Sequence, residues 1–225
     1  MKIGVIGAGV MGRGIAQVSA MAGHKVVLFD INHDVLESAK TAVTKNLNKA
    51  IELGKLTEEG KNATEGNLQY SNSIADVRVD LVIEAIVERL DVKAKVLADL
   101  AEINGKDTIY ASNTSSIPLT QIAANFVYPK QVVGIHYFNP AHIMKLVEVI
   151  SAEQTDPKVV ETALEYVKSV NKTCVVAKDA PGFIVNRVAR HFYVEGLKVL
   201  EENVASHETI DDLVRASGFK MGPFQ

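Results

Sequence analysis

Short apolar runs alternate with stretches of helical periodicity along much of the chain. A short apolar run is typical of a strand that is buried on both faces of a parallel sheet. Such runs occupy residues 3–6, 26–29, 80–87, 108–111 and 132–138. Between several of them, apolar residues recur at the spacing of one helix face, at 12–22, 32–51 and 92–103. This alternation predicts an α/β fold with a doubly wound, mostly parallel sheet.

The segment after the second predicted strand is longer than a crossover requires. Apolar residues between Val35 and Ile51 lie on one helical stripe, and Thr57 followed by two glutamates marks the start of a further helix. We therefore expect a helical hairpin from Asn32 to about Gly66. Such an excursion is suited to reaching over a substrate.

The pattern continues with a strand that carries a charge. Alternating apolar residues predict a strand at 144–150, and a helix at 157–170 and a strand at 173–177 follow. Glu148 falls on the apolar face of the first of these strands. Because a buried unpaired charge is unfavourable, this carboxylate needs a partner.

The chain changes character near residue 180. The sequence Lys178-Asp179-Ala180-Pro181-Gly182 breaks the pattern, and helices are predicted afterwards at 183–203 and 206–218. We therefore expect two domains, an α/β domain at 1–180 and the beginning of a helical domain at 181–225.

The composition is that of an ordinary globular protein. Of 225 residues, 47% are hydrophobic and 23% charged, with a net charge of −3, so nothing favours nucleic acid or an anionic membrane surface as a partner. No apolar run approaches the roughly 20 residues of a membrane-spanning helix. The first strand begins too early to leave room for a signal peptide, so we expect a cytoplasmic protein. The single Cys174 can form no internal disulfide, and no cluster predicts a metal site.

A glycine-rich turn joins the first predicted strand to the first predicted helix, Gly7-Ala8-Gly9-Val10-Met11-Gly12. In a dinucleotide-binding turn the first glycine permits the bend, the second lets the backbone approach a pyrophosphate, and the third lets helix and strand pack closely. The helix N-terminus faces the phosphate charge. Asp30, at the end of the second strand, would accept hydrogen bonds from the adenosine ribose and repel a 2′-phosphate. The sequence therefore predicts a Rossmann-type site for NAD rather than NADP.

Most of the other polar signals follow the same edge of the predicted sheet. Ligands of doubly wound sheets bind beyond the carboxyl ends of the strands. The residues at those ends are 7–12, Asp30, Glu88, 112–116 and 136–140. We therefore expect a single crevice to collect them.

Five motifs, in order, resemble the L-3-hydroxyacyl-CoA dehydrogenase family, which includes the 3-hydroxybutyryl-CoA dehydrogenases. They are the glycine turn with Asp30, Ala111–Ser116, His136–Pro140, the strand Lys145–Val149 and Ala180–Arg187. The resemblance spans essentially the whole chain. It implies an oxidoreductase that transfers a hydride reversibly between C3 of a 3-hydroxyacyl-CoA and NAD, and it leaves open fatty acid breakdown, butyrate synthesis or an aromatic catabolic route.

The resemblance implies that the catalytic residues are His136, Glu148, Ser115 and Asn186. In the family, a histidine in the H-x-F-N-P segment takes the hydroxyl proton, and a glutamate twelve residues later holds it. A carboxylate beside an imidazole fixes its tautomer and stabilises the imidazolium, and the pairing also gives Glu148 its partner. Ser115 corresponds to a serine that hydrogen-bonds the 3-oxygen, and Asn186 to an asparagine that assists from the second domain.

The resemblance also implies a set of NAD-binding residues. They are Gly7, Ala8, Gly9, Val10, Met11, Gly12, Asp30, Glu88, Lys93, Asn113, Ser115 and Asn139. In the family, the residues at the positions of Glu88 and Lys93 contact the ribose on the nicotinamide side. By spacing alone, Glu88 is a strand-end acid and Lys93 a solvated helix residue.

The candidate substrate-binding residues are Ser115, Asn46, Lys49 and Lys55. Family members contact CoA through a small polar residue and a lysine on the helical excursion, and these positions hold Asn46 and Leu53 here. The CoA phosphates would then be met by Lys49 or Lys55.

Family chains continue beyond the segment at which this one stops. Their further helices cover the cofactor, complete the acyl pocket and build much of a dimer interface. We therefore expect the chain to be truncated in its C-terminal domain and the full-length protein to be a homodimer. The helix at 183–203 should then expose apolar residues.

Two other functions remain open. A related β-hydroxyacid dehydrogenase would combine the same nucleotide domain with a catalytic lysine and a free acid substrate, but Lys198 lies far along a helix and matches no motif. A non-catalytic NAD-binding protein would be favoured if His136 or Glu148 were replaced, and both are present.

Overall fold

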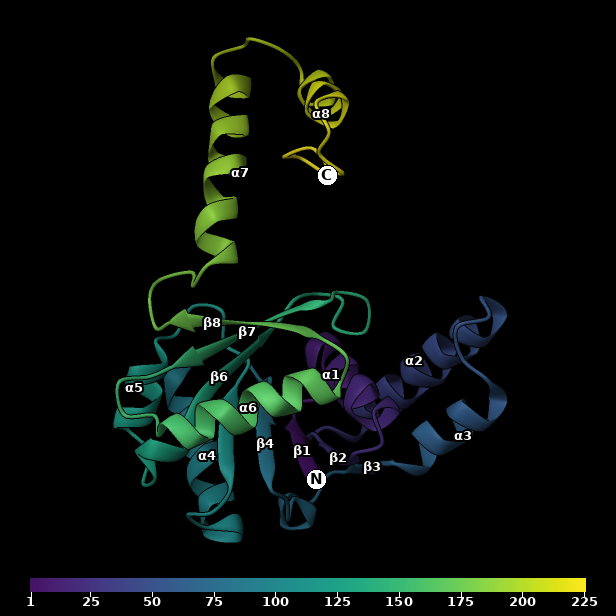
Figure 1. The fold of residues 1–225 in the computed structure, drawn as a ribbon, viewed down its shortest axis with the longest axis vertical. Coiled ribbons are helices and arrows are strands. Elements are labelled where there is room, and N and C mark those ends of the chain that lie inside the picture. The colour runs from purple at the N-terminus through teal and green to yellow at the C-terminus, as the bar shows by residue number, and fades with distance from the viewer. The chain divides into compact units, whose positions relative to one another are not determined.

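An eight-stranded sheet organises the first part of the chain (Figure 1). The computed structural model describes residues 1–225 and divides into two units, Met1–Ala180 and Pro181–Gln225. The strand order is β3-β2-β1-β4-β5-β6-β7-β8. Strands β1 to β6 run parallel, whereas β7 is antiparallel to β6 and parallel to β8. The predicted α/β fold with a mostly parallel sheet is therefore confirmed.

The strands are short and mostly buried. They are β1 (Lys2–Ile6), β2 (Lys25–Phe29), β3 (Leu68–Ser71), β4 (Leu81–Glu84), β5 (Ile109–Ser112), β6 (Val132–Tyr137), β7 (Leu146–Ser151) and β8 (Thr173–Lys178). The helices of this unit are α1 (Val10–Met21), α2 (His33–Glu52), α3 (Glu58–Gly66), α4 (Leu90–Asn104), α5 (Leu119–Ala124) and α6 (Pro157–Ser169). Two 3₁₀ turns are η1 (Ile74–Asp76) and η2 (Pro129–Gln131). None of the helices has both the length and the apolar character needed to cross a membrane.

The helical excursion predicted after β2 is present as α2 and α3. Each helix begins at a side-chain cap: Asn32 accepts the N–H of Asp34 (2.9 Å), and Thr57 accepts the N–H of Gly60 (3.1 Å). These caps satisfy N–H groups that the first helical turn leaves unpaired. The excursion ends in β3, an edge strand that the sequence analysis missed.

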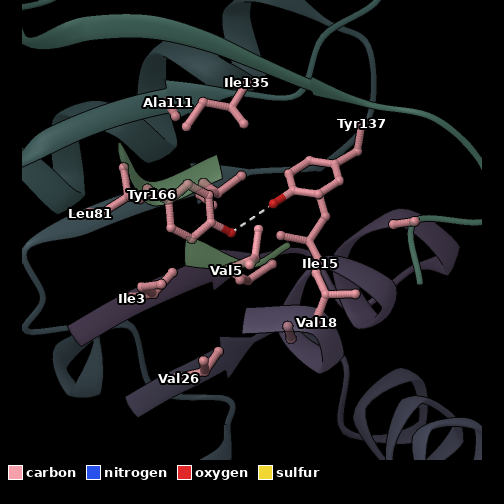
Figure 2. Packing of buried hydrophobic residues seen from close by; sticks show 14 of the residues in the cluster. Ile3, Val5, Ile15, Val18, Val26, Leu81, Ala111, Ile135, Tyr137 and Tyr166 are labelled. Atoms are coloured by element: carbon pink, nitrogen blue, oxygen red, sulfur yellow. Dashed lines mark hydrogen bonds between the residues drawn. The ribbon is translucent and has the colours of Figure 1, made fainter. Parts of the chain in front are cut away.

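One face of the sheet packs against α1 and α6 (Figure 2). Ile3, Ile15 and Val167 share a buried cluster there, and the Tyr166 hydroxyl lies 2.9 Å from the Tyr137 hydroxyl. Burial raises the pKa of Tyr166 to about 12, so this phenol stays protonated. Because side chains alternate along a strand, residues next to this cluster point to the other face.

The opposite face therefore receives the polar side chains of the sheet. Glu84 follows Ile83 of the cluster, Ser112 follows Ala111, and His136 precedes Tyr137. Helices α4 and α5 lie on this side: Lys93 of α4 contacts Glu84, and a Cβ at Gly134 would lie 3.3 Å from Leu119 of α5. The alternation of side chains along β4, β5 and β6 thus places the polar and charged groups of these strands on one face of the sheet.

The second unit contains two amphipathic helices, α7 (Val185–Glu201) and α8 (His207–Ala216). Ser206 caps α8 by accepting the N–H of Thr209 (3.3 Å). The buried carboxylate of Asp211 accepts the N–H of Phe224 (3.0 Å). Helix α7 exposes the apolar side chains of Val188, Tyr193, Val194 and Leu197.

Candidate active site

The glycine turn lies between β1 and α1, and its geometry distinguishes the three glycines. Gly7 has a φ of +96°, which residues with a Cβ rarely adopt. A Cβ at Gly12 would lie 1.7 Å from the carbonyl oxygen of Gly7, so helix and turn are in direct backbone contact there. A Cβ at Gly9 would meet nothing within 4 Å, so there is open space over the N-terminus of α1. Val10 and Met11 form the first turn of that helix.

Asp30 holds the glycine turn from the end of β2. One carboxylate oxygen accepts the N–H of Ala8 (2.8 Å), and the other accepts the N–H of Asn32 (2.9 Å). A largely apolar pocket opens beside it, lined by Gly7, Gly9, Asp30, Ile31, Val35, Ile86, Val87 and Val92, among others. An open glycine turn, a helix N-terminus and an adjacent carboxylate fit the pyrophosphate and ribose of a dinucleotide.

His136 and Glu148 face each other directly across the antiparallel pair β6 and β7. His136 Nδ1 lies 2.8 Å from Glu148 Oε2. The imidazole is 5% exposed and the glutamate is fully buried. The predicted pair is therefore formed, and the contact at Nδ1 sets the orientation of the ring.

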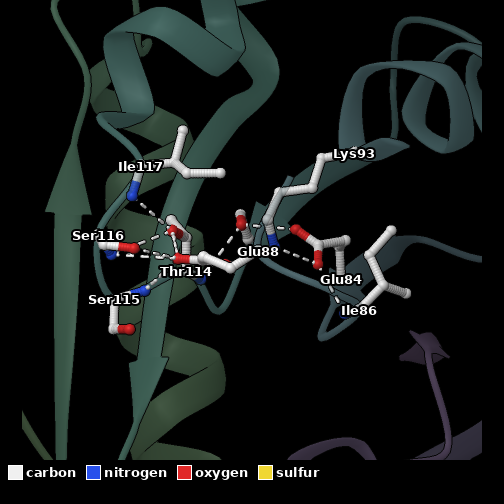
Figure 3. A network of polar contacts seen from close by, with 9 residues as sticks. Glu84, Ile86, Glu88, Lys93, Thr114, Ser115, Ser116 and Ile117 are labelled. Atoms are coloured by element: carbon white, nitrogen blue, oxygen red, sulfur yellow. Dashed lines mark hydrogen bonds and ion pairs between the residues drawn. The ribbon is translucent and has the colours of Figure 1, made fainter. Parts of the chain in front are cut away.

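The loop after β5 presents Ser115 and is organised by Glu88 (Figure 3). Glu88 Oε1 accepts the N–H groups of Ser115 and Ser116 (3.1 Å each) and the hydroxyls of Thr114 and Ser116. Burial opposes the ionisation of Glu88, but the hydrogen bond from Thr114 and the charge of Lys93 lower its pKa to about 2. Glu88 is therefore an anion that fixes this loop at neutral pH.

Lys93 is buried, in contrast to the solvated position that helical spacing alone predicts. Its side chain is 1% exposed, and its Nζ lies 2.6 Å from Glu84 Oε1 and 3.0 Å from Glu88 Oε2. Glu84 was missed as a site residue. The available signal was a carboxylate inside the apolar run 80–87, the same signal that drew attention to Glu148.

Two asparagines stand at the ends of neighbouring strands. Asn113 Oδ1 accepts the N–H of Tyr137 (2.8 Å), and its own N–H donates to the Glu84 carbonyl (2.8 Å). Asn113 thus ties the end of β5 to the ends of β6 and β4. Asn139 is exposed, just beyond β6.

The three candidate CoA-binding residues on or near α2 line one pocket. Asn46, Lys49 and Lys55 share it with Gln17 and His142, among others. Asn46 donates to the Gln17 side chain (3.1 Å), and Lys49 pairs with Glu52 (2.8 Å) on an exposed face.

Asn186 belongs to the second unit. It is the second residue of α7 and follows a turn in which the N–H of Arg187 donates to the Gly182 carbonyl (3.1 Å). No three or more His, Cys, Asp or Glu side chains are grouped as metal ligands would be.

The chain is similar to known proteins along its whole length. Residues 2–180 match the family described as "3-hydroxyacyl-CoA dehydrogenase, NAD binding domain", and residues 182–225 match "3-hydroxyacyl-CoA dehydrogenase, C-terminal domain". The 3-hydroxyadipyl-CoA dehydrogenase of Escherichia coli K12 is 45% identical over 228 residues, which cover 99% of this chain and 47% of that protein. The chain thus spans about half the length of this relative.

Two further relatives are shorter proteins. The 3-hydroxybutyryl-CoA dehydrogenase of Clostridioides difficile is 38% identical over 225 residues, covering 99% of this chain and 80% of the relative. The crystal structure of (S)-3-hydroxybutyryl-CoA dehydrogenase from Ralstonia eutropha superposes with a TM-score of 0.95 at 37% identity, over 99% of this chain and 79% of that one. Sequence and fold therefore agree on the same group of proteins.

Proposed function

Because the chain belongs to the 3-hydroxyacyl-CoA dehydrogenase family, we propose that it oxidises the C3 hydroxyl of an L-3-hydroxyacyl-CoA to a ketone, with NAD as the oxidant. The observation that carries this proposal is the 2.8 Å contact between His136 Nδ1 and Glu148 Oε2, across the neighbouring strands β6 and β7 of a sheet that carries a dinucleotide-binding turn. A buried histidine oriented by a carboxylate is the arrangement that a general base requires. The activity and substrate of the whole protein are part of this proposal.

In this proposal His136 is the residue that moves the proton. NAD supplies the acceptor for the hydride that leaves C3. Nε2 of His136 accepts the hydroxyl proton as the ketone forms, and Glu148 stabilises the resulting imidazolium through Nδ1. Glu148 is thus a positioning residue, because it acts through the imidazole and is fully buried itself.

Ser115 and Asn186 are assigned to the 3-oxygen of the substrate. In the reducing direction, negative charge develops on that oxygen, and fixed hydrogen-bond donors stabilise the transition state. The anchoring of the Ser115 backbone by Glu88 supports this role, because an oriented donor needs no rearrangement during the reaction.

The proposed NAD site runs along the glycine turn. Gly7, Gly9 and Gly12 shape the turn, and Asp30 receives the adenosine ribose as well as holding Ala8. Glu88, Asn113 and Asn139 are assigned to the nicotinamide half of the site. Lys93 contacts Glu88 Oε2, whereas the other carboxylate oxygen, Oε1, holds the loop that presents Ser115.

The acyl-CoA is assigned to the pocket lined by Asn46, Lys49 and Lys55. The two lysines would meet phosphate groups as mobile cations on a flexible stem. We also propose that the protein forms a homodimer, which the exposed apolar side chains of α7 support.

The proposal is tested by following NADH oxidation by this chain with acetoacetyl-CoA, alongside NADH binding by fluorescence. Turnover with tight NADH binding is the expected result. Binding without turnover would restrict the chain to a nucleotide-binding role, whereas an absence of binding would overturn the proposal at the glycine turn.

A further inference from the structure

A closed ring of polar contacts lies beside the loop that presents Ser115 (Figure 3). On one side, Glu84 Oε2 accepts the Ser112 hydroxyl (2.7 Å), and the Ser112 Oγ accepts the N–H of Thr114 (3.2 Å). On the other side, Lys93 Nζ donates to Glu84 Oε1 (2.6 Å) and lies 3.0 Å from Glu88 Oε2. The Thr114 hydroxyl donates to Glu88 Oε1 and closes the ring.

The carboxylate of Glu84, from which both sides of this ring start, is buried away from water. Glu84 is 0% exposed, and its partners Lys93 and Ser112 are 1% exposed. The N–H of Ile86 also donates to Glu84 Oε1 (2.7 Å). Three donors therefore hold one carboxylate, which satisfies a buried charge that would otherwise be strongly unfavourable.

Both branches that leave Glu84 end on the same short loop. The branch through Ser112 reaches the backbone of Thr114. The branch through Lys93 reaches Glu88, whose Oε1 accepts the N–H groups of Ser115 and Ser116. Two separate routes of polar contacts therefore connect this loop to one side chain, Glu84, at the end of β4.

We propose that Glu84 is a positioning residue for the dehydrogenase reaction, which holds the Ser115 loop through Lys93 and Ser112. The role of Ser115, and so the link to catalysis, rests on the proposed function. Glu84 itself is too deeply buried to touch substrate or cofactor. Lys93, which the family resemblance assigns to NAD, carries this positioning to the loop, because it binds the two carboxylates that connect the strand to it.

The test separates this role from a purely structural one with the double variant Glu84→Gln/Lys93→Met. Replacing a buried ion pair by uncharged side chains of similar volume is often neutral for stability, so the Tm should stay near that of the wild type. Amide hydrogen exchange in residues 113–117 of the ligand-free protein should nevertheless rise by about tenfold or more, because the anchor of Glu88 is lost. A merely structural pair would leave this exchange unchanged.

The kinetic readout follows the same logic. With acetoacetyl-CoA and NADH, kcat should fall by roughly tenfold to a hundredfold, the effect of a displacement of about 1 Å at a reacting group, and by a larger factor than either KM changes. The proposal would be overturned if the loop of the double variant exchanged at the wild-type rate. It would also be overturned if the loop exchanged faster while kcat stayed unchanged. Failure of the wild-type chain to oxidise NADH would instead overturn the proposed function, since exchange is measured without substrate.

Two single variants complete the experiment. Asp91→Asn, in the first turn of α4, breaks the exposed ion pair with Arg89, the residue before that helix, and should leave loop exchange and kcat unchanged. Ser112→Ala cuts the other branch of the ring and should speed exchange of the Thr114 amide. If the double variant does not fold, an unchanged Thr114 amide in Ser112→Ala would overturn the proposal.

Discussion

The carboxylate of Asp30 accepts the backbone N–H of Ala8 at 2.8 Å, which ties the end of β2 to the glycine turn after β1. The same side chain also accepts the N–H of Asn32 at the start of the helical excursion. Asp30 therefore shapes the turn in addition to its proposed contact with ribose. A substitution at this position should affect both roles.

We predict that Asp30→Asn weakens NADH binding by about tenfold, because one of its two acceptor oxygens becomes a donor and a charged hydrogen bond is lost. The preference for NADH over NADPH should also narrow, since the repulsion of a 2′-phosphate is removed. Fluorescence titration with both nucleotides measures the two effects. The exposed Asp34→Asn is the matched control, and equal binding by both variants would contradict the assignment.

His136→Gln is expected to lower kcat by about a hundredfold or more, the contribution of a positioned general base. NADH affinity should change little, because the nucleotide is assigned to the glycine turn. Steady-state kinetics and a binding titration on the same preparation distinguish the two. His207→Gln, on the surface of α8, is the control. A parallel loss of NADH affinity would argue that His136 supports the nucleotide site instead.

Glu148→Gln should lower kcat less than His136→Gln, by roughly tenfold, because the amide can still accept a hydrogen bond but cannot balance an imidazolium charge. KM for the acyl-CoA should be nearly unchanged. The split between kcat and KM is the informative quantity. A rise in KM at constant kcat would show that the residue shapes the pocket rather than orienting the base.

Alanine at two glycines of the turn should affect different properties, the stability of the fold at Gly12 and the binding of NADH at Gly9. Gly12→Ala places a Cβ against the Gly7 carbonyl oxygen and should destabilise the fold by about 1–3 kcal/mol, as overpacking does. Gly9→Ala meets no protein atom, so stability should change by about 1 kcal/mol or less while NADH binding weakens. Thermal unfolding and NADH titration of both variants test this contrast, and equal melting temperatures would refute it.

The low pKa of Glu88 predicts an acid-dependent contribution to stability. The folded-state pKa of about 2 lies below the ordinary value of 4.5, so the ionised group stabilises the fold above about pH 4.5, and this contribution is lost as the pH falls towards 2. The difference in Tm between wild type and Glu88→Gln should therefore be constant at neutral pH and shrink below pH 4.5. Glu161→Gln on α6 serves as the control, and a difference independent of pH would contradict the prediction.

The features that depend on local sequence were predictable. The glycine turn, the buried strands and the capped helices α2, α3 and α8 each have a signal within a few residues. The similarity of residues 2–180 to an NAD-binding family confirms the cofactor prediction. Strand β3 was missed because it follows α3 directly and has a half-exposed, polar sequence, Leu68–Ser71, that shows no apolar run.

The environment of Lys93 could not be inferred from spacing. Helical periodicity describes which residues share a face, but the burial of Lys93 depends on Glu84, which lies nine residues earlier on a different element. The connection forms only when β4 and α4 pack together. The pairing of His136 with Glu148 was predictable, because a carboxylate on the apolar face of β7 already required a partner. Their roles in catalysis stay predictions.

The register of β6 and β7 links the stability of the fold to the geometry of the site. Glu148 lies between Val147 and Val149, whose side chains fill the core on the opposite face of the sheet. A slip of one residue would turn both valines to the face that carries His136 and place the carboxylate in the apolar cluster on the other face. The strand register that fills the core is therefore the same register that sets Glu148 opposite His136.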